Sequence, residues 1–455
     1  MHARWPRAAL LALAAGALAL VSTSGGAPRP HLILLLTLDT TRADHLAIYG
    51  YPRPTSPALA RLAARGVLVR HAITPMPMTD PAHTSIFTGL HPRTHGIRLN
   101  GHCVADPEVA NLASWARALG YRTAAFVSRA HLRPAELGLR GFEFESGPSG
   151  AQRVGAQTLA LASRWIREHA TEPSFVWVHL FDQHAPYGAP PPYTTRFLEP
   201  GDPARVKLRG NEAAREPYTA PEVRALTALY DGEIAYTDDL VGQLIALVEE
   251  IAPPGNAPLI VVAGDHGEAL GELDARHRYA FDHGQLLYQG SLEVPLLLRW
   301  DGVLPAGREV AGPASLVDLA PTLFDLIGAR GFVTQGTSLR PQIQGQEARA
   351  PGLAFSERRL ISIGKCMRFR ALEQFSVQDG RYKLILSTPF SRTELYDLER
   401  DPGETADLAR AVPEIEARLR GAVEQWRTAW AATDAGDRVI PAEKREQLRA
   451  LGYVE

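Results

Sequence analysis

Long apolar runs alternate with amphipathic stretches along the first two thirds of the chain. The run HLILLLTL at 31–38 lacks any polar alternation, which is typical of a parallel strand buried on both faces. The stretch at 56–66 has apolar residues at helical spacing and ends at Gly66, which predicts a helix closed by glycine. Strand and helix patterns keep alternating through 111–128, 156–181 and 234–264. The prediction is a doubly wound, mostly parallel α/β sheet.

The pattern changes after about residue 330. Short apolar segments joined by Asp-Gly and Asp-Pro turns occupy 369–404, and a helical pattern follows at 412–432. We therefore predict a main domain at 30–330 and a smaller antiparallel α+β subdomain at 331–455. The Pro-rich stretch 184–218 directly follows a predicted strand, which predicts a loop that covers a substrate.

The N-terminus has the layout of a cleaved secretory signal. Arg4 and Arg7 precede an apolar run at 8–21, and small, turn-forming residues follow it. The apolar run is shorter than the ~20 residues that a membrane span needs, so we expect residues 1–26 to be removed rather than to anchor the chain. The mature protein is then periplasmic or secreted and is not an integral membrane protein.

The charge balance of the chain argues against nucleic acid as its partner. The 48 Lys and Arg residues nearly balance the 50 Asp and Glu residues, so no net basic field predicts binding to nucleic acid. Cys103 and Cys366 are the two cysteines, and they either form one disulfide or remain free thiols in the core. We look instead for a site that binds a small anionic substrate.

Polar residues gather where three of the predicted strands end. One apolar run ends at Asp39, a second at Asp182 and His184, and a third at Asp265 and His266. A single Asp after a strand is more often a turn or capping residue than a ligand. Three such ends in one parallel sheet favour a functional site, because ligands bind outside the carboxyl ends of the strands.

Asp39, Asp265 and His266 offer two carboxylates and an imidazole, a ligand set that suits one divalent ion. Thr79 completes four ligands with its hydroxyl. Its sequence context, TDPAH, predicts the start of a helix, where Thr is a common cap and where an anion is favoured. A metal lowers the pKa of a bound hydroxyl, so Thr79 is either a capping residue or a nucleophile aimed at a tetrahedral ester.

These residues lie in stretches that resemble a known family. From about Pro30 to the end, the chain resembles a sulfatase of the alkaline phosphatase superfamily. The resemblance implies an α/β sandwich with a C-terminal subdomain, a metal at the strand ends and ester hydrolysis through a covalent intermediate. The matching blocks are LTLDTTRADHLAIYGY, TDPAHTSIFTGLHPRTHGIRLNG, WVHLFDQHAPY, YDGEIAYTDDLVGQL, VAGDHGEALGE, HGQLLYQGSLEVPLLLR and GRYKLI with ELYDLERDPGETADLA.

Four positions depart from the family pattern. Typical sulfatases have a cysteine, matured to formylglycine, where this chain has Thr79. Their paired aspartates are Asp39 and Thr40 here, their Asp-Asn pair is Asp265 and His266, and a lysine is replaced by His283. The histidine at 266 adds a nitrogen ligand to what is otherwise a calcium-type oxygen site. The set resembles the branches of the superfamily that transfer phosphoryl groups to a threonine. The resemblance to these branches, which use Asp, Asp and His, implies zinc or manganese, with calcium as the alternative.

The remaining polar residues near the strand ends are candidate substrate-binding and catalytic groups. Asn100 stands about where related phosphodiesterases hold the anion, although RLNG is also a turn sequence. His83 follows Thr79 by one helical turn and is either a substrate contact or a packed residue. For His184 and His283 we favour anion binding and acid catalysis, while a second metal site that includes Asp182 stays open.

The function that we predict is a sulfatase-like, metal-dependent hydrolase acting on a phosphate or sulfate ester, with phosphate mono- or diesters ahead of sulfate esters. One alternative is a sulfatase proper. The other is a catalytically silent protein that binds an anionic glycan or lipid head group.

Overall fold

The computed structural model describes residues 28–430, apart from gaps at 102–104, 106–108, 204, 210–215, 330, 347–351, 361–371 and 389–391. The expected signal segment and both cysteines lie outside the described residues.

Eight strands form one large sheet, in the order β4-β3-β5-β1-β6-β7-β2-β8. All neighbours run parallel except β7, which is antiparallel to both β6 and β2. The mostly parallel α/β sheet predicted from the sequence is therefore confirmed. The strand bounds are β1 Leu32–Leu38, β2 Val67–Ile73, β3 Arg122–Val127, β4 Phe144–Ser146, β5 Ser174–Leu180, β6 Leu259–Gly264, β7 Glu293–Arg299 and β8 Arg308–Ser315.

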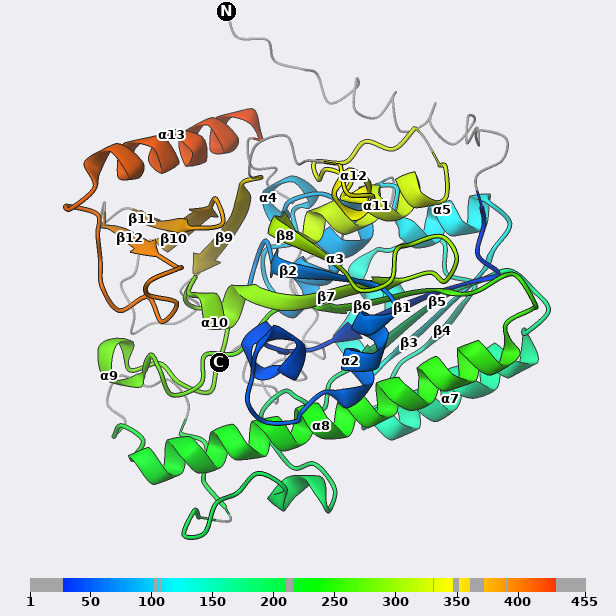
Figure 1. The fold of residues 1–455 in the computed structure, drawn as a ribbon, viewed down its shortest axis with the longest axis horizontal. Coiled ribbons are helices and arrows are strands. Elements are labelled where there is room, and N and C mark those ends of the chain that lie inside the picture. Colours follow the sequence, from blue (N-terminus) through cyan, green and yellow to red (C-terminus); the bar gives the residue numbers. More distant parts are fainter. Residues whose placement is uncertain are drawn as a thin grey trace, which may run out of the picture.

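Helices cover both faces of this sheet, as Figure 1 shows. On one face lie α2 (Pro57–Ala64), α7 (Gly155–Glu168) and the long α8 (Ala220–Ile251). On the other lie α3 (Thr79–Thr88), α5 (Leu112–Ala118), α11 (Leu319–Leu326) and α12 (Arg340–Ile343). Every residue of β1 is buried, as expected for a strand whose two faces both meet helices.

Short helical turns complete the large domain. The α-helical turns are α4 Pro92–His95, α6 Pro134–Leu137, α9 Asp274–His277 and α10 Gln289–Leu292. The 3₁₀ turns are η1 Ala43–His45, η2 Ala47–Tyr49, η3 Ala130–Leu132, η4 Tyr193–Thr195 and η5 Leu316–Asp318.

The C-terminal part forms a separate four-stranded antiparallel sheet, in the order β12-β11-β10-β9, packed against the helix α13 (Pro413–Ala429). This confirms the smaller antiparallel unit. Its strands are β9 Ala354–Leu360, β10 Leu372–Gln378, β11 Tyr382–Thr388 and β12 Arg392–Asp397.

Strand β9 also attaches to the large domain, next to the segment that leads into α3. The Ser356 hydroxyl donates to the Thr74 carbonyl at 2.7 Å, and the Glu357 amide donates to the Pro75 carbonyl at 2.9 Å. The Glu357 carboxylate in turn accepts from the Arg93 amide at 2.7 Å. The C-terminal sheet thus supports the chain just before the predicted nucleophile.

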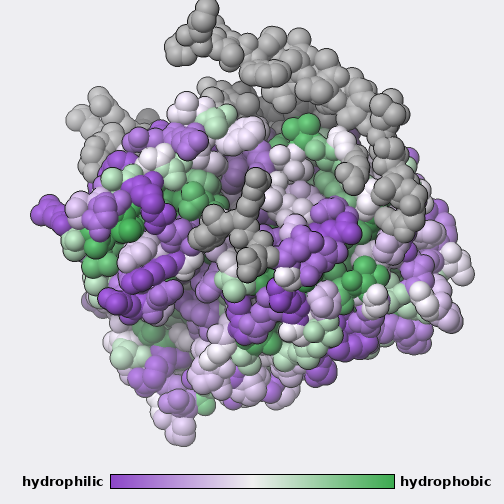
Figure 2. Space-filling model, turned by 45° about the horizontal axis from the view of Figure 1, so that its top comes forward, coloured by the Kyte–Doolittle hydropathy of each residue, from purple (hydrophilic) through white to green (hydrophobic). Residues whose placement is uncertain are grey.

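Hydrophilic residues cover most of the face shown in Figure 2, and hydrophobic ones form small patches between them. Across the described part of the chain, no helix has both the length and the apolar character needed to cross a membrane.

Candidate active site

The carboxyl ends of β1 and β6, which are neighbours in the sheet, bring the predicted metal ligands together. Asp39 follows β1 and Asp265 follows β6. Thr40, the residue after Asp39, adopts a left-handed backbone with φ of 47°, a conformation that costs free energy for a residue other than glycine. In this conformation its amide donates to Asp265 Oδ1 at 3.2 Å, so the turn after β1 ties the two strand ends together.

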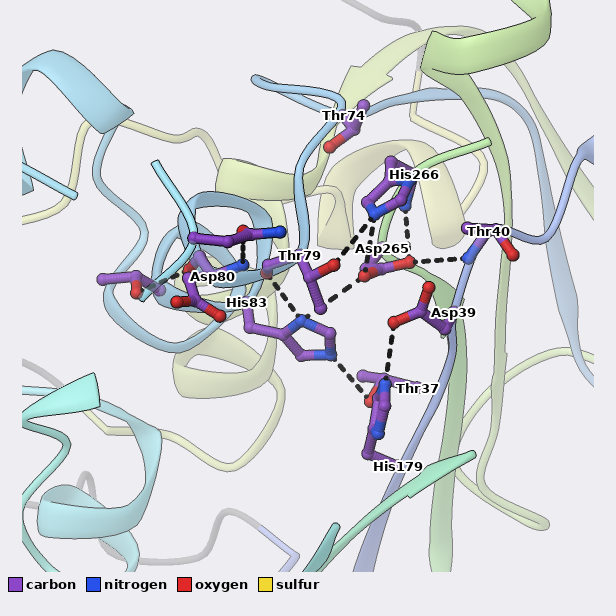
Figure 3. A network of polar contacts seen from close by, with 12 residues as sticks. Thr37, Asp39, Thr40, Thr74, Thr79, Asp80, His83, His179, Asp265 and His266 are labelled. Carbon is purple, nitrogen blue, oxygen red and sulfur yellow. Dashed lines mark hydrogen bonds and ion pairs between the residues drawn. The ribbon is translucent and has the colours of Figure 1, made fainter. Parts of the chain in front are cut away.

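Asp39, Asp265 and His266 form a compact, fully buried cluster whose ligand atoms all lie within 4.8 Å of one another (Figure 3). Asp39 Oδ1 and Asp265 Oδ2 are buried and have no hydrogen-bond partner among the described residues. Buried carboxylate oxygens rarely stay unpaired, because desolvation is costly. A divalent cation would satisfy both oxygens, so the residues present fit the predicted metal.

The two carboxyl groups also affect each other's ionisation. Burial opposes the charged form of both, and the negative charge of Asp39 further raises the pKa of Asp265 well above its usual value. For Asp39, the hydrogen bond from His179 and the nearby histidines outweigh burial and lower the pKa. Two adjacent buried carboxylates resist joint ionisation unless a cation lies between them.

His266 has its lone pair directed into this cluster. Its Nδ1 lies 3.0 Å from the Gly267 carbonyl, which only accepts, so Nδ1 carries the proton. Burial, with a further contribution from His283, lowers the pKa of His266 to about 3, and the ring is neutral at pH 7. The unprotonated Nε2 then lies 3.2 Å from Thr79 Oγ1 and is free to bind a metal or accept the hydroxyl proton.

Thr79 is the first residue of α3, one position inside the helix rather than at its cap, which is Met78. Its side chain is fully buried and points toward His266 and Asp265 (Figure 3). The hydroxyl therefore meets the metal cluster at a helix N-terminus, where unpaired amides and the helix dipole favour an anion.

His83 links the backbone of Thr79 to strand β1. Its Nδ1 donates to the Thr79 carbonyl at 2.8 Å, and its Nε2 lies 3.0 Å from the Thr37 hydroxyl of β1. Burial, then the nearby His179, lowers the pKa of His83 to about 3, so the ring is neutral and Thr37 donates to it. Both ring nitrogens are thus engaged by the protein.

Asn100 lies beside the first turn of α3. Its Oδ1 accepts from the Asp80 amide at 2.9 Å, which leaves the Nδ2 group as its donor end. That Nδ2 is buried and has no hydrogen-bond partner among the described residues, while the whole residue is 2% exposed. An unpaired buried donor next to a helix N-terminus fits the anion contact expected for Asn100.

The His283 ring lies next to His266, and the His184 ring meets the His283 ring edge-on. The His283 ring lies 4.4 Å from that of His266 and 5.0 Å from that of His184. Burial alone would lower the pKa of His283, but Glu268, 3.4 Å from its Nδ1, raises it to about 9. Burial, with the charge of His283, lowers the pKa of His184 to about 3, and its Nδ1 donates to the Ala185 carbonyl. Of the two rings, His283 is the one that carries an extra proton at neutral pH.

Asp182 faces a different neighbour. Its Oδ1 accepts from the Gly155 amide at 2.9 Å, at the N-terminus of α7, and burial raises its pKa. Within the described residues, the close group of potential metal ligands is Asp39, Asp265 and His266. The second metal site with Asp182 stays a prediction without a matching ligand cluster.

The structure adds four site residues that the sequence reading did not single out: Arg129, His131, His179 and Glu268. Arg129 and His131 follow β3, whose neighbour in the sheet is β5. The buried Arg129 guanidinium lies over the Phe181 ring at 4.1 Å. Burial lowers the pKa of both His179 and His184, and the charge of Arg129 adds to this effect. The polar sequence SRAH after the apolar run RTAAFV was the available signal for two of them.

Two family models and several curated proteins match the chain. The family model Sulfatase matches residues 31–329, and the model N-sulphoglucosamine sulphohydrolase, C-terminal, matches 276–429. Steryl-sulfatase of Mus musculus is 24% identical over 542 aligned positions, covering 91% of this chain and 85% of its own length. Arylsulfatase K of Xenopus laevis is 27% identical over 219 positions, covering 46% of this chain and 39% of its own length.

Solved structures show the same fold. A 2-O GAG sulfatase superposes with a TM-score of 0.70 at 18% identity, covering 89% of this chain and 92% of its own. The phosphonate monoester hydrolase of Agrobacterium radiobacter superposes with a TM-score of 0.70 at 22% identity, covering 90% and 97%. With a family model matched over most of its length and hydrolases among its relatives, the chain belongs to the sulfatase family and is an ester-hydrolysing enzyme.

Proposed function

We propose that this enzyme hydrolyses phosphate esters, with diesters favoured, through a covalent intermediate on unmodified Thr79. The observation that carries the proposal is the Thr79 hydroxyl at the head of α3, 3.2 Å from His266 Nε2 and beside two unpaired carboxylate oxygens. A sulfatase proper is the alternative, supported by the sulfatase relatives. The phosphonate monoester hydrolase among the similar structures is consistent with phosphoryl chemistry in this fold.

Members of the sulfatase family bind a divalent metal ion, and Asp39, Asp265, His266 and Thr79 would hold it here. Bound in this cluster, the ion would neutralise the carboxylates and lower the pKa of the Thr79 hydroxyl. The neutral imidazole of His266 favours zinc over calcium. Manganese stays the second candidate, because of the resemblance to the phosphoryl-transferring branches.

Each side chain of the site has a separate role in the reaction. Asn100 Nδ2 binds the anionic oxygens, and Thr79 Oγ1 releases its proton to solvent and attacks the tetrahedral centre in line. The bond to the leaving oxygen breaks, and His283 supplies the proton that this oxygen takes up. Water then attacks the Thr79 ester from the side that the alcohol left and passes a proton to the now neutral His283. The bond from phosphorus to Thr79 Oγ1 breaks, the phosphate or phosphate monoester leaves, and Oγ1 takes up a proton from solvent, which regenerates the hydroxyl.

Thr79 also favours phosphate over sulfate on chemical grounds. The hydrate of a formylglycine can release sulfate by collapsing to an aldehyde, whereas a threonine ester must be cleaved by a second in-line attack. Sulfate turnover should therefore be slow.

A substrate panel with matched variants tests the proposal. Purified enzyme is analysed for metal and assayed with aryl sulfate, phosphate monoester and phosphate diester substrates. Thr79→Ala should lower kcat/KM for the best phosphate ester by ~10²-fold or more, and Thr79→Ser should keep part of the activity. Ser85→Ala, which removes a buried hydroxyl from the same helix, serves as the control. Near-normal turnover by Thr79→Ala, or a wild-type preference for aryl sulfate, would refute the proposal.

We also propose that the enzyme acts in the periplasm or outside the cell after residues 1–26 are removed. The basic start, the apolar run and the small residues that follow it support this. Intact-mass analysis of natively expressed protein should show the loss of roughly 20–30 N-terminal residues, the usual length of a signal. A full-length product recovered from the cytoplasm would overturn the idea.

A further inference from the structure

Asp80, the residue after the nucleophile, is bonded to two other segments of the chain. It is the second residue of α3 and is 1% exposed. Its Oδ2 accepts from the Gly101 amide at 2.6 Å, and its Oδ1 contacts His131 Nδ1 at 2.5 Å. Both carboxylate oxygens are therefore committed to groups outside its own helix.

Asp80 forms two hydrogen bonds with the loop at residues 100 and 101. The Asp80 amide binds Oδ1 of Asn100, and the Asp80 carboxylate binds the amide of the next residue, Gly101. Gly101 has a left-handed backbone with φ of 69°, so the chain turns sharply at this point. With its side-chain oxygen and the following amide both fixed, Asn100 can present only its Nδ2 group to a ligand.

The third contact joins Asp80 to the segment that follows β3. His131 lies in η3, and its ring is buried against Asp80. One carboxylate therefore joins the start of α3, the loop that carries Asn100 and the segment after β3. Figure 3 shows Asp80 on the side of Thr79 away from Asp39 and His266, so these contacts lie apart from the metal cluster.

We propose that Asp80, itself held by His131, is a positioning residue that fixes Asn100 at the N-terminus of α3 and thereby sets the affinity of the site for the anionic group of the ester. The proposal rests on the proposed function, because it assumes that an anion binds beside Thr79. It assigns a role to a residue that neither binds the metal nor attacks the substrate.

Inorganic phosphate is the probe for this role, because its affinity can be measured without turnover. The variants are Asp80→Ala, Asp80→Asn, Asn100→Ala and the double variant Asp80→Ala with Asn100→Ala. For each we would measure the phosphate inhibition constant, kcat, KM, bound metal and thermal midpoint. Ser85→Ala is again the control, since it removes a buried hydrogen bond to His95 elsewhere on α3.

Asp80→Ala should weaken phosphate binding about tenfold, as expected when a hydrogen bond to a charged ligand is lost, with metal content unchanged. Asp80→Asn keeps the shape and one acceptor, so its loss should be smaller. Because Asp80 acts through Asn100, the double variant should be little worse than Asn100→Ala alone. A residue needed only for folding would instead give losses that multiply.

Three results would overturn the proposal: phosphate affinity of Asp80→Ala and Asp80→Asn within twofold of wild type, multiplicative losses in the double variant, or no phosphate binding by metal-loaded wild type. The nucleophile assignment fails separately. If Thr79→Ala stays active while Asp80→Ala loses phosphate affinity through Asn100, the proposed function is wrong and the role of Asp80 stands.

Discussion

Replacing His179 should weaken metal binding without touching a metal ligand. His179 Nε2 lies 3.2 Å from Asp39 Oδ2, and this is the contact that fixes the Asp39 carboxylate with Oδ1 toward the metal cluster (Figure 3). Both side chains are fully buried. His179→Leu removes the donor and leaves Asp39 Oδ2 without its partner.

The size of the effect follows from this contact. A hydrogen bond to an ionised group contributes roughly 1.5–3 kcal/mol, and 3.2 Å is at the long end of the N–H···O range, so we take about 1.5 kcal/mol. That free energy corresponds to about a tenfold rise in the metal dissociation constant, the lower end of what loss of such a supporting partner usually costs.

Competition with a chromogenic chelator measures this constant directly. The amide nitrogen of Gln can take the place of His Nε2, so His179→Gln should keep most of the affinity that His179→Leu loses. His95→Gln is the control for loss of a buried imidazole, because His95 contacts Ser85 of α3 at 3.0 Å and is not part of the metal cluster. Wild-type metal affinity in His179→Leu, or equal losses in the Leu and Gln variants, would refute the reasoning.

Three further predictions concern the site and its surroundings. Asp265→Ala should release the metal, and stoichiometric metal in the purified variant would contradict the site. Glu268→Gln should lower the pKa of His283 from about 9, because the opposing effect of burial remains, and should move the alkaline limb of the kcat/KM profile to lower pH; an unmoved limb would exclude His283 as the acid. Burial raises the pKa of Glu233 to about 8, so between about pH 4.5 and 8 the folded chain keeps a proton that the unfolded chain releases, and stability falls as pH rises. Glu233→Gln, which keeps an acceptor for the Gly188 amide, should therefore have a higher urea midpoint than wild type at pH 9 and an equal one at pH 4.5; equal midpoints at both would contradict the shift.

The sequence was sufficient to predict the two strands that are followed by the metal ligands. Continuous apolar runs ending in Asp39 and Asp265 mark parallel strands, and parallel neighbours bring their carboxyl ends to one edge. Strands β2, β7 and β8 were not predicted. The reversed direction of β7 could not be predicted either, because an apolar run such as EVPLLLR does not indicate which way its strand runs in the sheet. The direction is set by connections and packing.

Side-chain partners were harder to predict than strand ends. Asp182 and Asp265 both follow apolar runs, yet one carboxylate meets the Gly155 amide and the other meets the metal cluster. That difference depends on which helix begins nearby, which only the folded chain defines. For the same reason His83, one helical turn from Thr79, could be placed near the nucleophile, but its bond to Thr37 could not be foreseen.

The attachment of β9 to the segment before α3 has a consequence for the order in which the enzyme is made. Ser356 follows its partner Thr74 by 282 positions, so most of the chain must be synthesised before this support exists. Until then the residues leading to Thr79 lack two of their backbone contacts. Catalytic competence should therefore arise late in biosynthesis, and a chain released before β9 should hold its metal ligands without a fixed nucleophile.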